Sequence, residues 1–449
     1  LPAACGGGGS GGADVFLGRF VEEPVGHLDG EIAAQVLLAM LVAALSRLDA
    51  WMPGARVNLL TRDVERTSQV LPGVQPVDAT GRDLWGSSHP ICGYSAKRLP
   101  RPFGLVLEQV EGRIRRTSPG TFGALLKLAR TFRGKDVDAT LAIEELIKNA
   151  TGLIVSGQGG INDEFYRHAL GTLAILERAQ RQGRPTLMFG QGIGPITNPK
   201  LKSRCREVLP KVDHICLRES QFGPPFLRSI GVPEEKFTVT GDDAIELSNS
   251  FASEEIGTGL GVNVRVARYS AVNALQVEEM GRQVTRFAAE LDAPIIGLPV
   301  RRDCPPDDNT SIRELVKDVR GQVSLNDTVS TPEQLAEQVS RCRVVVTGSY
   351  HAGVFALSQG LPVVGVYAQE YYRQKFLGLA EMFPGGLTAV DIAADDAPQE
   401  LGTALRSAWS MAEELRPRLL ARASEQASAA NRAFEACMQR FLPAQLIAC

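Results

Sequence analysis

The chain is 449 residues long, about three times the length of a typical domain, so we expect two globular domains or one enlarged domain. Hydrophobic residues make up 44% of the sequence and charged residues 22%, a balance typical of a globular protein and unlike that of a disordered chain. The formal net charge of −3 excludes nucleic-acid binding driven by overall positive charge.

Eight cysteines are scattered along the chain without a C-x-x-C pair or a zinc-ligand spacing, and this pattern favours buried, reduced thiols. The most apolar stretch, 32–45, is shorter than the roughly 20 residues that a membrane-spanning helix needs. We therefore expect a buried helix there, no integral membrane segment and a cytoplasmic protein. The sequence begins with Leu1 and a glycine tract, which leaves open that a targeting segment precedes it.

Short apolar runs alternate with longer helical patterns through most of the chain, which is typical of parallel sheets covered by helices on both faces. This predicts an α/β fold with two Rossmann-like, doubly wound domains facing a cleft, over 13–250 and 258–449. A polar, Ala-, Glu- and Arg-rich stretch near the end is expected to form one or two amphipathic helices. In chain order, the predicted strands are 15–20, 56–60, 152–155, 186–189, 214–217, 237–239, 260–264, 294–298, 344–346 and 363–366.

The segment 80–135 differs from the rest of the first domain. It combines Gly-, Pro- and Ser-rich pieces with a local excess of Arg and Lys. We interpret it as an irregular, solvated basic insertion; the alternative is an insertion that binds the acceptor substrate.

Before the first long helix, the turn at 26–31 carries Asp29 and Glu31. Carboxylates at a helix N-terminus are most often caps. The same two side chains also lie where a general base would meet a hydroxyl group of an acceptor. Both interpretations stay open at this point.

Two glycine-rich loops follow consecutive predicted strands of the first domain. In an open parallel sheet, ligands bind outside the carboxyl ends of the strands, and glycines there let the backbone approach an anion. The alternative is that tight turns need glycine for steric reasons alone. Neither loop is a dinucleotide fingerprint and no Walker A lysine is present, so NAD and ATP are poor candidates. The candidate binding residues are Gly157, Gln158, Gly159, Gly160, Gln191 and Gly192.

Arginine and histidine follow other predicted strands. Arg218 comes directly after the predicted strand 214–217, and Arg265 comes directly after 260–264. Each arginine is predicted to bind a carboxylate or phosphate with two hydrogen bonds; the alternative is a salt bridge within the protein. After 344–346, a glycine-containing loop leads into a helix that begins at about a histidine. The ring N–H of that histidine binds or protonates an anionic substrate, or it merely caps the helix. The residues of this loop are Ser349, Tyr350 and His351.

Taken together and in this order, the loops resemble the polysaccharide pyruvyl transferase family. The chain departs from the family pattern at Gln158, where a glycine often stands, at Asp242-Asp243, where the family has Asp-Pro, and at Ser349-Tyr350, where the family has Arg-Phe. The lost arginine removes one anion contact. The matching segments are 26–31, 156–160, 190–195, 217–220, 241–244, 262–265 and 350–363.

The resemblance implies a GT-B-like fold with the active site in the cleft between the domains. It also implies transfer of a pyruvyl group from phosphoenolpyruvate to two hydroxyls of a sugar, which forms a pyruvate ketal on a polysaccharide or glycan precursor. The partners are then phosphoenolpyruvate, as a co-substrate, and a sugar acceptor, without nucleic acid, cofactor or metal. A homo-oligomer stays open.

The donor carries a carboxylate and a phosphate, so its site needs several cations or N–H dipoles. Arg218, Arg265, Arg373 and the helix start at His351 are the candidates. We predict that His351 is the general acid or a phosphate ligand, and that Asp29 or Glu31 is the base.

Two alternatives remain because a fold does not determine a function. The first is a GT-B glycosyltransferase that uses a nucleotide sugar, for which Glu370 is the candidate uridine-binding residue. The second is a non-catalytic, glycan-binding relative that has kept the fold.

Overall fold

The structure is a computed structural model. Asp29, Glu31 and Gln158 lie outside the residues that it describes. The described residues are 14–18, 34–61, 64–79, 91–92, 99–131, 138–157, 159–267, 270–300, 307–325, 329 and 331–441.

The first domain is built on a parallel sheet of seven strands in the order β3-β2-β1-β4-β5-β6-β7. Its central strands are continuous apolar runs that are buried along their whole length, as expected for a sheet with helices on both faces. The strands are β1 (Asp14–Gly18), β2 (Arg56–Thr61), β3 (Gln75–Asp78), β4 (Gly152–Ser156), β5 (Thr186–Gln191), β6 (His214–Leu217) and β7 (Phe237–Val239).

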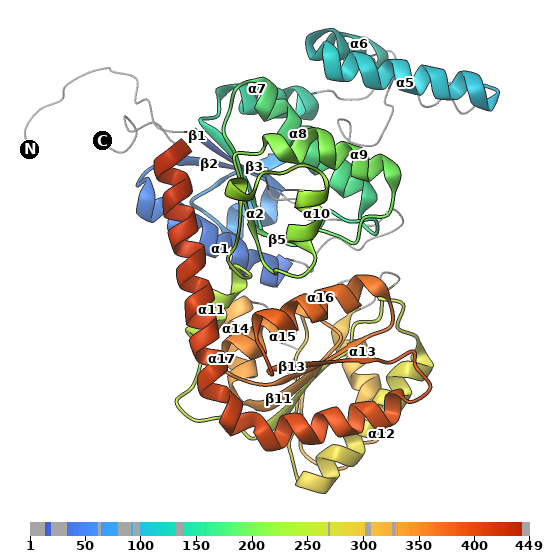
Figure 1. Cartoon of the computed structure of the whole chain (residues 1–449), viewed down its shortest axis with the longest axis vertical. Helices are drawn as coiled ribbons and strands as arrows, with labels where there is room; N and C mark the ends of the chain where they lie inside the picture. Colours follow the sequence, from blue (N-terminus) through green and yellow to red (C-terminus); the bar gives the residue numbers. More distant parts are fainter. Residues whose placement is uncertain are drawn as a thin grey trace, which may run out of the picture.

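Helices connect these strands and cover the sheet (Figure 1). One core cluster joins β4, β5 and β6 to the apolar faces of the helices on one side of the sheet. The helices of this half are α1 (Ala34–Trp51), α2 (Val64–Val70), α5 (Arg101–Thr117), α6 (Pro119–Thr131), α7 (Asp138–Asn149), α8 (Tyr166–Arg181), α9 (Pro199–Val208), α10 (Gly223–Ser229) and α11 (Ala244–Asn249), with 3₁₀ turns η1 (Leu209–Lys211) and η2 (Glu234–Lys236).

The second domain repeats this architecture with six parallel strands in the order β10-β9-β8-β11-β12-β13. Capping boxes begin α12 and α14, where Asn273 and Thr331 each exchange hydrogen bonds with a glutamine three residues later. The elements are β8 (Gly259–Asn263), α12 (Ala274–Leu291), β9 (Ile295–Gly297), α13 (Asp308–Leu315), β10 (Val323–Ser324), α14 (Pro332–Ser340), β11 (Cys342–Thr347), α15 (Tyr350–Ser358), β12 (Val363–Tyr367), α16 (Glu370–Met382) and β13 (Leu387–Asp391).

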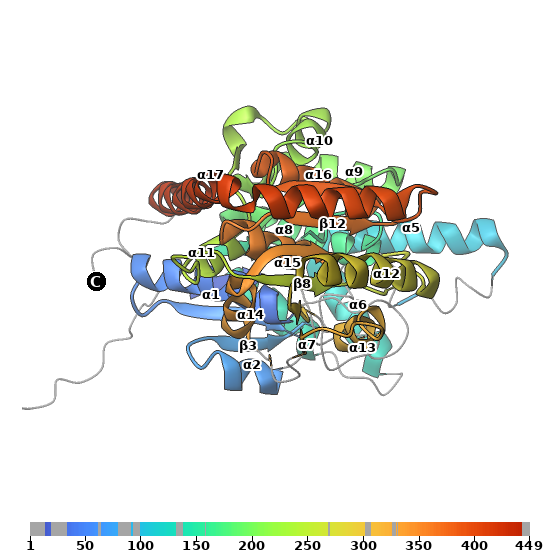
Figure 2. The ribbon, with the colours of Figure 1, turned by 90° about the horizontal axis from the view of Figure 1, so that it is seen from below.

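A single helix, α17 (Ala397–Phe441), runs alongside both domains (Figures 1 and 2). Its first part packs on the second sheet, whereas near its end Phe434 lies 5.1 Å from Phe189 of β5, between ring centroids. Arg47 of α1 donates a 2.6 Å hydrogen bond to Asn431. The last turns of α17, expected in the second domain, therefore pack on the first.

The structure confirms two Rossmann-like domains, and each of the ten predicted strands overlaps an observed strand. Three short strands, β3, β10 and β13, were not predicted. The basic insertion also differs from the expectation, because its described part folds into α5 and α6. Prolines lie in the first turn of both helices, where a missing N–H costs nothing, so they begin these helices rather than interrupt them.

Five of the cysteines are described; none of these forms a disulfide, and four are buried. Within the described residues no helix combines the length and apolar character needed to span a bilayer. In the same part of the chain, His, Cys, Asp and Glu form no group of three that would hold a metal ion.

Candidate active site

The candidate residues cluster where the strand order of each sheet reverses, which is where open α/β sheets bind ligands. In the first sheet, β4 starts the second half and is followed by the glycine loop at 157–160. In the second sheet, Arg265 follows β8, and α15 with His351 follows the neighbouring strand β11. The order of the strands therefore brings these three loops to the ligand-binding edges.

Arg218 leaves the end of β6 and lies against both glycine loops. A Cβ at Gly159 would lie 2.6 Å from Arg218 Nη2, and a Cβ at Gly192 would lie 2.5 Å from Arg218 Nε. Such distances are far below van der Waals contact, so both positions require glycine while the arginine is in this place. In this structure the two loops surround a guanidinium group.

The guanidinium of Arg218 also lies under Tyr350 of the second domain. Arg218 Cζ is 4.2 Å from the centroid of the Tyr350 ring, which is a cation–π geometry. Asp242 Oδ2, after β7, is 3.6 Å from Arg218 Nη1, which is too long for a hydrogen bond. Arg218 and Asp242 thus form a buried ion pair that is longer than a hydrogen bond.

Electrostatics keep Arg218 cationic. Burial acts to lower the pKa of Arg218, but electrostatic interactions, led by those with Tyr350 and Asp242, together outweigh burial and raise that pKa above its ordinary value. Burial raises the pKa of the Asp242 carboxyl, with Arg218 opposing it. Burial also raises the pKa of the Tyr350 hydroxyl, which stays protonated at neutral pH.

Lys375 of α16 is a second cation at the same junction, and it was not predicted from the sequence. Its Nζ is 4.1 Å from the ring centroid of Tyr371 and 5.7 Å from that of Tyr350. Phe165 of the first domain meets Tyr371 edge to face, with 5.6 Å between ring centroids. The spacing of Tyr371 and Lys375, four residues apart on a helix that follows a buried strand, is the signal that would have found the pair.

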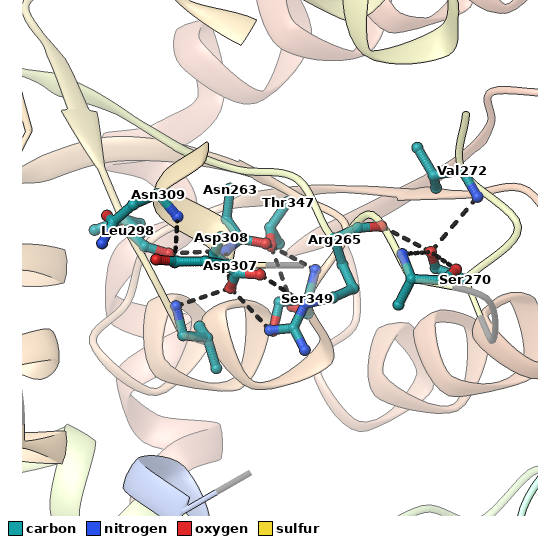
Figure 3. A network of polar contacts seen from close by, with 12 residues as sticks. Asn263, Arg265, Ser270, Val272, Leu298, Asp307, Asp308, Asn309, Thr347 and Ser349 are labelled. Atoms are coloured by element: carbon teal, nitrogen blue, oxygen red, sulfur yellow. Dashed lines mark hydrogen bonds and ion pairs between the residues drawn. The ribbon is translucent and has the colours of Figure 1, made fainter. Parts of the chain in front are cut away.

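Arg265 is engaged differently, in a buried network shown in Figure 3. Its Nε and Nη2 each lie 2.8 Å from an oxygen of Asp308, a carboxylate that is almost fully buried. Asn263 Nδ2 and the Val300 N–H donate to the same carboxylate at 2.9 and 3.0 Å. The charge of Arg265 is therefore balanced within the second domain by two short contacts to one carboxylate, whereas the ion pair of Arg218 with Asp242 is longer.

The loop after β11 is ordered by Thr347. The N–H of Ser349 donates a 2.8 Å hydrogen bond to Thr347 Oγ1, whose own hydroxyl reaches Asn263 Oδ1 at 3.3 Å. As the sequence predicted, a helix begins here, and α15 places half-buried His351 one residue after Tyr350. The two rings meet edge to face with 5.2 Å between centroids.

The remaining candidates lie at varying distances from this cluster. Gln191 is fully buried, and its Nε2 donates to the carbonyls of Val155 and Phe189 at 3.1 and 2.7 Å, which holds β4 to β5. Gly157 has a positive φ of 37°, which glycine adopts readily. Arg373 is exposed on α16, 3.3 Å from Glu370, the candidate uridine-binding residue. Gly160 is buried at the end of its loop.

The sequence of this chain is similar to that of a known protein family. It matches the family described as polysaccharide pyruvyl transferase over residues 122–370, which is more than half of its length. The chain belongs to the polysaccharide pyruvyl transferase family. This match includes Arg218, Arg265 and His351, and it ends before Lys375. No curated protein matches this chain.

Solved structures with the same fold are known. A putative UDP-N-acetylglucosamine 2-epimerase from Listeria monocytogenes has a TM-score of 0.56 at 12% identity, covering 96% of both chains. The UDP-GlcNAc 2-epimerase from Neisseria meningitidis, bound to UDP-GlcNAc, scores 0.53 at 10% identity and covers 95% of this chain and 100% of its own. MurG from Acinetobacter baumannii scores 0.50 at 14% identity, covering 95% and 99%. These similarities show a GT-B fold for this transferase family member.

The contact between Gly192 and Arg218 makes a direct prediction. Gly192→Ala is expected to lower the free energy of unfolding by about 1–3 kcal/mol, because the added methyl overlaps a buried guanidinium. Gly73→Ala is the matched control, since a Cβ there meets nothing within 4 Å. Denaturant unfolding measures both. In an Arg218→Ala background the Gly192→Ala effect should disappear; its persistence would show that Arg218 is not the neighbour that excludes a side chain.

Proposed function

We propose that this protein transfers the pyruvyl group of phosphoenolpyruvate to two hydroxyls of a sugar or glycan acceptor, releasing phosphate and forming a pyruvate ketal. Family membership supports the transferase class. Phosphoenolpyruvate enters as a co-substrate, so the proposal requires no resident cofactor.

The observation that carries the proposal is the pair of cations around Tyr350 at the domain junction. Arg218 comes from the first domain and Lys375 from the second, and both lie within 6 Å of the Tyr350 ring centroid. Phosphoenolpyruvate presents a carboxylate and a phosphate, and two separated cations suit two anionic groups. His351 is next to Tyr350 at the beginning of α15, where the helix also offers N–H groups.

The chemistry then follows from what the donor requires. His351 gives a proton to the methylene carbon, and a sugar hydroxyl attacks the neighbouring carbon, which forms a C–O bond. Departure of phosphate regenerates a cation at that carbon, and the second hydroxyl closes the ketal. Each hydroxyl loses a proton; one returns to His351 and the other leaves with phosphate. The proposal that Asp29 or Glu31 is the base concerns residues outside the described part of the chain.

The burial of Arg218 sets a condition on binding. Its side chain is only 4% exposed, between the glycine loops of the first domain and Tyr350 of the second. We therefore expect the donor to enter when the two domains move apart and to be enclosed when they close, as a lid would enclose it. Ser349 stands where the family often has arginine, and in the described part of the chain Arg218 and Lys375 lie over the Tyr350 ring.

Isothermal titration with phosphoenolpyruvate, and with UDP-N-acetylglucosamine as the comparison ligand, tests the donor. We expect phosphoenolpyruvate to bind with a Kd in the micromolar to millimolar range, about −8 to −4 kcal/mol. Arg218→Ala is expected to weaken binding at least tenfold, and Arg218→Lys to weaken it less, because lysine keeps the charge but not the two-pronged geometry. Release of phosphate in a panel of sugar acceptors then reports turnover.

Arg228→Ala is the matched control, because Arg228 lies on α10, ten residues further along, and pairs with Glu234 at the surface. Its affinity for phosphoenolpyruvate should equal that of the unaltered protein. Binding of the UDP-sugar without binding of phosphoenolpyruvate would overturn the proposal in favour of a nucleotide-sugar glycosyltransferase. Silence toward both ligands, and no phosphate release with any acceptor, would favour a non-catalytic, glycan-binding relative.

A further inference from the structure

Helices α5 and α6 form a hairpin that stands away from the rest of the first domain in Figure 1, and part of α5 projects beyond the other helices in Figure 2. Phe122 and Leu126 of α6 are fully buried against Ile114 of α5 and Ala174 of α8. The Glu111 carboxylate accepts hydrogen bonds from the backbone N–H groups of 91 and 92 at 3.2 and 2.7 Å. These contacts hold the hairpin to the rest of the first domain and leave other side chains of the hairpin exposed.

The outer side of the hairpin is apolar. Among the described residues, eleven large hydrophobic side chains are exposed, and seven of them belong to this short segment. Positions 103, 106, 107 and 110 have the spacing that places side chains on one face of a helix. Such a concentration favours an interaction site, because exposed apolar residues are normally scattered singly over a surface. The seven are Leu99, Phe103, Val106, Leu107, Val110, Leu125 and Leu128.

The hairpin is also positively charged. Residues 99–131 contain six Arg or Lys and two Asp or Glu, which gives a net charge of +4, whereas the whole chain carries −3. The remaining residues therefore carry −7. One of the two acidic side chains, Glu111, is buried under the hairpin. Arg113 and Lys127 are exposed on the two helices. Exposed apolar side chains together with basic ones suit a binding partner that has an apolar layer beneath an anionic surface.

We propose that the α5–α6 hairpin docks this protein onto the surface of a membrane that contains anionic lipids. The apolar face enters the boundary between headgroups and acyl chains, and the basic side chains reach the lipid phosphates. The helices lie on the bilayer and do not cross it. A second copy of the chain is a poorer occupant, because pairing two hairpins face to face would bring +4 against +4. The inference is independent of the proposed pyruvyl transfer.

Sedimentation of the full chain with vesicles tests the docking. One set contains phosphatidylcholine alone, and the other contains phosphatidylglycerol as about one third of the lipid. We expect binding to the second set, at least tenfold weaker binding to the first, and loss of binding as salt is raised. Phe103→Ser combined with Val106→Ser should reduce binding to the anionic vesicles at least tenfold. Leu275→Ser, at a 75% exposed position on α12, is the matched control and should bind normally.

The charge has its own test. Arg113→Glu should weaken binding to the anionic vesicles severalfold, whereas Arg286→Glu, on α12, should leave it unchanged. Equal binding of the control and hairpin variants, or equal binding to both vesicle sets, would overturn the proposal. So would association of the free protein into dimers that Phe103→Ser abolishes, because the patch would then belong to an interface between copies. Vesicle binding needs neither donor nor acceptor, so its failure and a failure of pyruvyl transfer are separate results.

Discussion

Replacement of Asp308 by alanine is expected to lower the free energy of unfolding by about 3–5 kcal/mol, because it leaves a buried arginine without its counter-charge. Asp308 accepts from Arg265, Asn263 and the Val300 N–H, and it is 1% exposed. Denaturant unfolding of the whole chain, followed by circular dichroism, measures the loss.

The double variant Arg265→Met/Asp308→Leu separates charge burial from side-chain packing. Removing both charges should restore much of the stability that Asp308→Ala loses, because no unpaired ion remains. A double variant as unstable as Asp308→Ala would show that packing, rather than the ion pair, supports this region. Titration of the double variant with phosphoenolpyruvate also tests the sequence-based role of Arg265. Retained affinity would make Arg265 a structural residue, and lost affinity would make it a donor ligand.

The strands and their order were predictable because a parallel sheet needs apolar runs that are buried on both faces, and such runs are visible in a sequence. The missed strands show the limit of this signal. β10 has two residues and β3 contains a proline and polar side chains, so neither has a periodic pattern. In the segment 101–131, prolines and glycines suggested irregular structure, yet their positions in the first turns and the apolar spacing between them are those of helices.

The sequence predicted which loops carry the candidate site residues, but not which residues those side chains contact. Arg218, Arg265 and His351 each follow a predicted strand, which was enough to nominate them. The sequence could not reveal that one arginine is packed in two glycine loops while the other is paired with a carboxylate 43 residues away. Lys375 was missed because its place beside Tyr350 depends on how α16 packs against α15, although its spacing from Tyr371 is visible in the sequence.

His351→Ala is expected to lower kcat for ketal formation by about 10²–10⁴-fold, the usual contribution of a positioned general acid. If His351 protonates the methylene carbon, its loss slows the chemical step and leaves the Kd for phosphoenolpyruvate nearly unchanged, because Arg218 and Lys375 still hold the anionic groups. If His351 is instead a phosphate ligand, affinity and kcat fall together. Titration with the donor and initial rates of phosphate release separate the two roles.

His214→Gln is the matched control, because His214 lies at the amino end of β6, away from the carboxyl ends of the strands where the candidate site lies. Its Nε2 is 3.1 Å from Thr238 Oγ1. Its kcat should stay within a factor of two or so of the unaltered protein. His351 is half-buried at the start of a helix whose next residues are buried, so both variants need matching thermal unfolding curves before their rates are compared. Unchanged turnover in folded His351→Ala would remove the histidine from the chemistry and transfer the acid role to another group at the junction. The Tyr350 hydroxyl, which burial keeps protonated between Asp242 and Arg218, would then be the next group to replace.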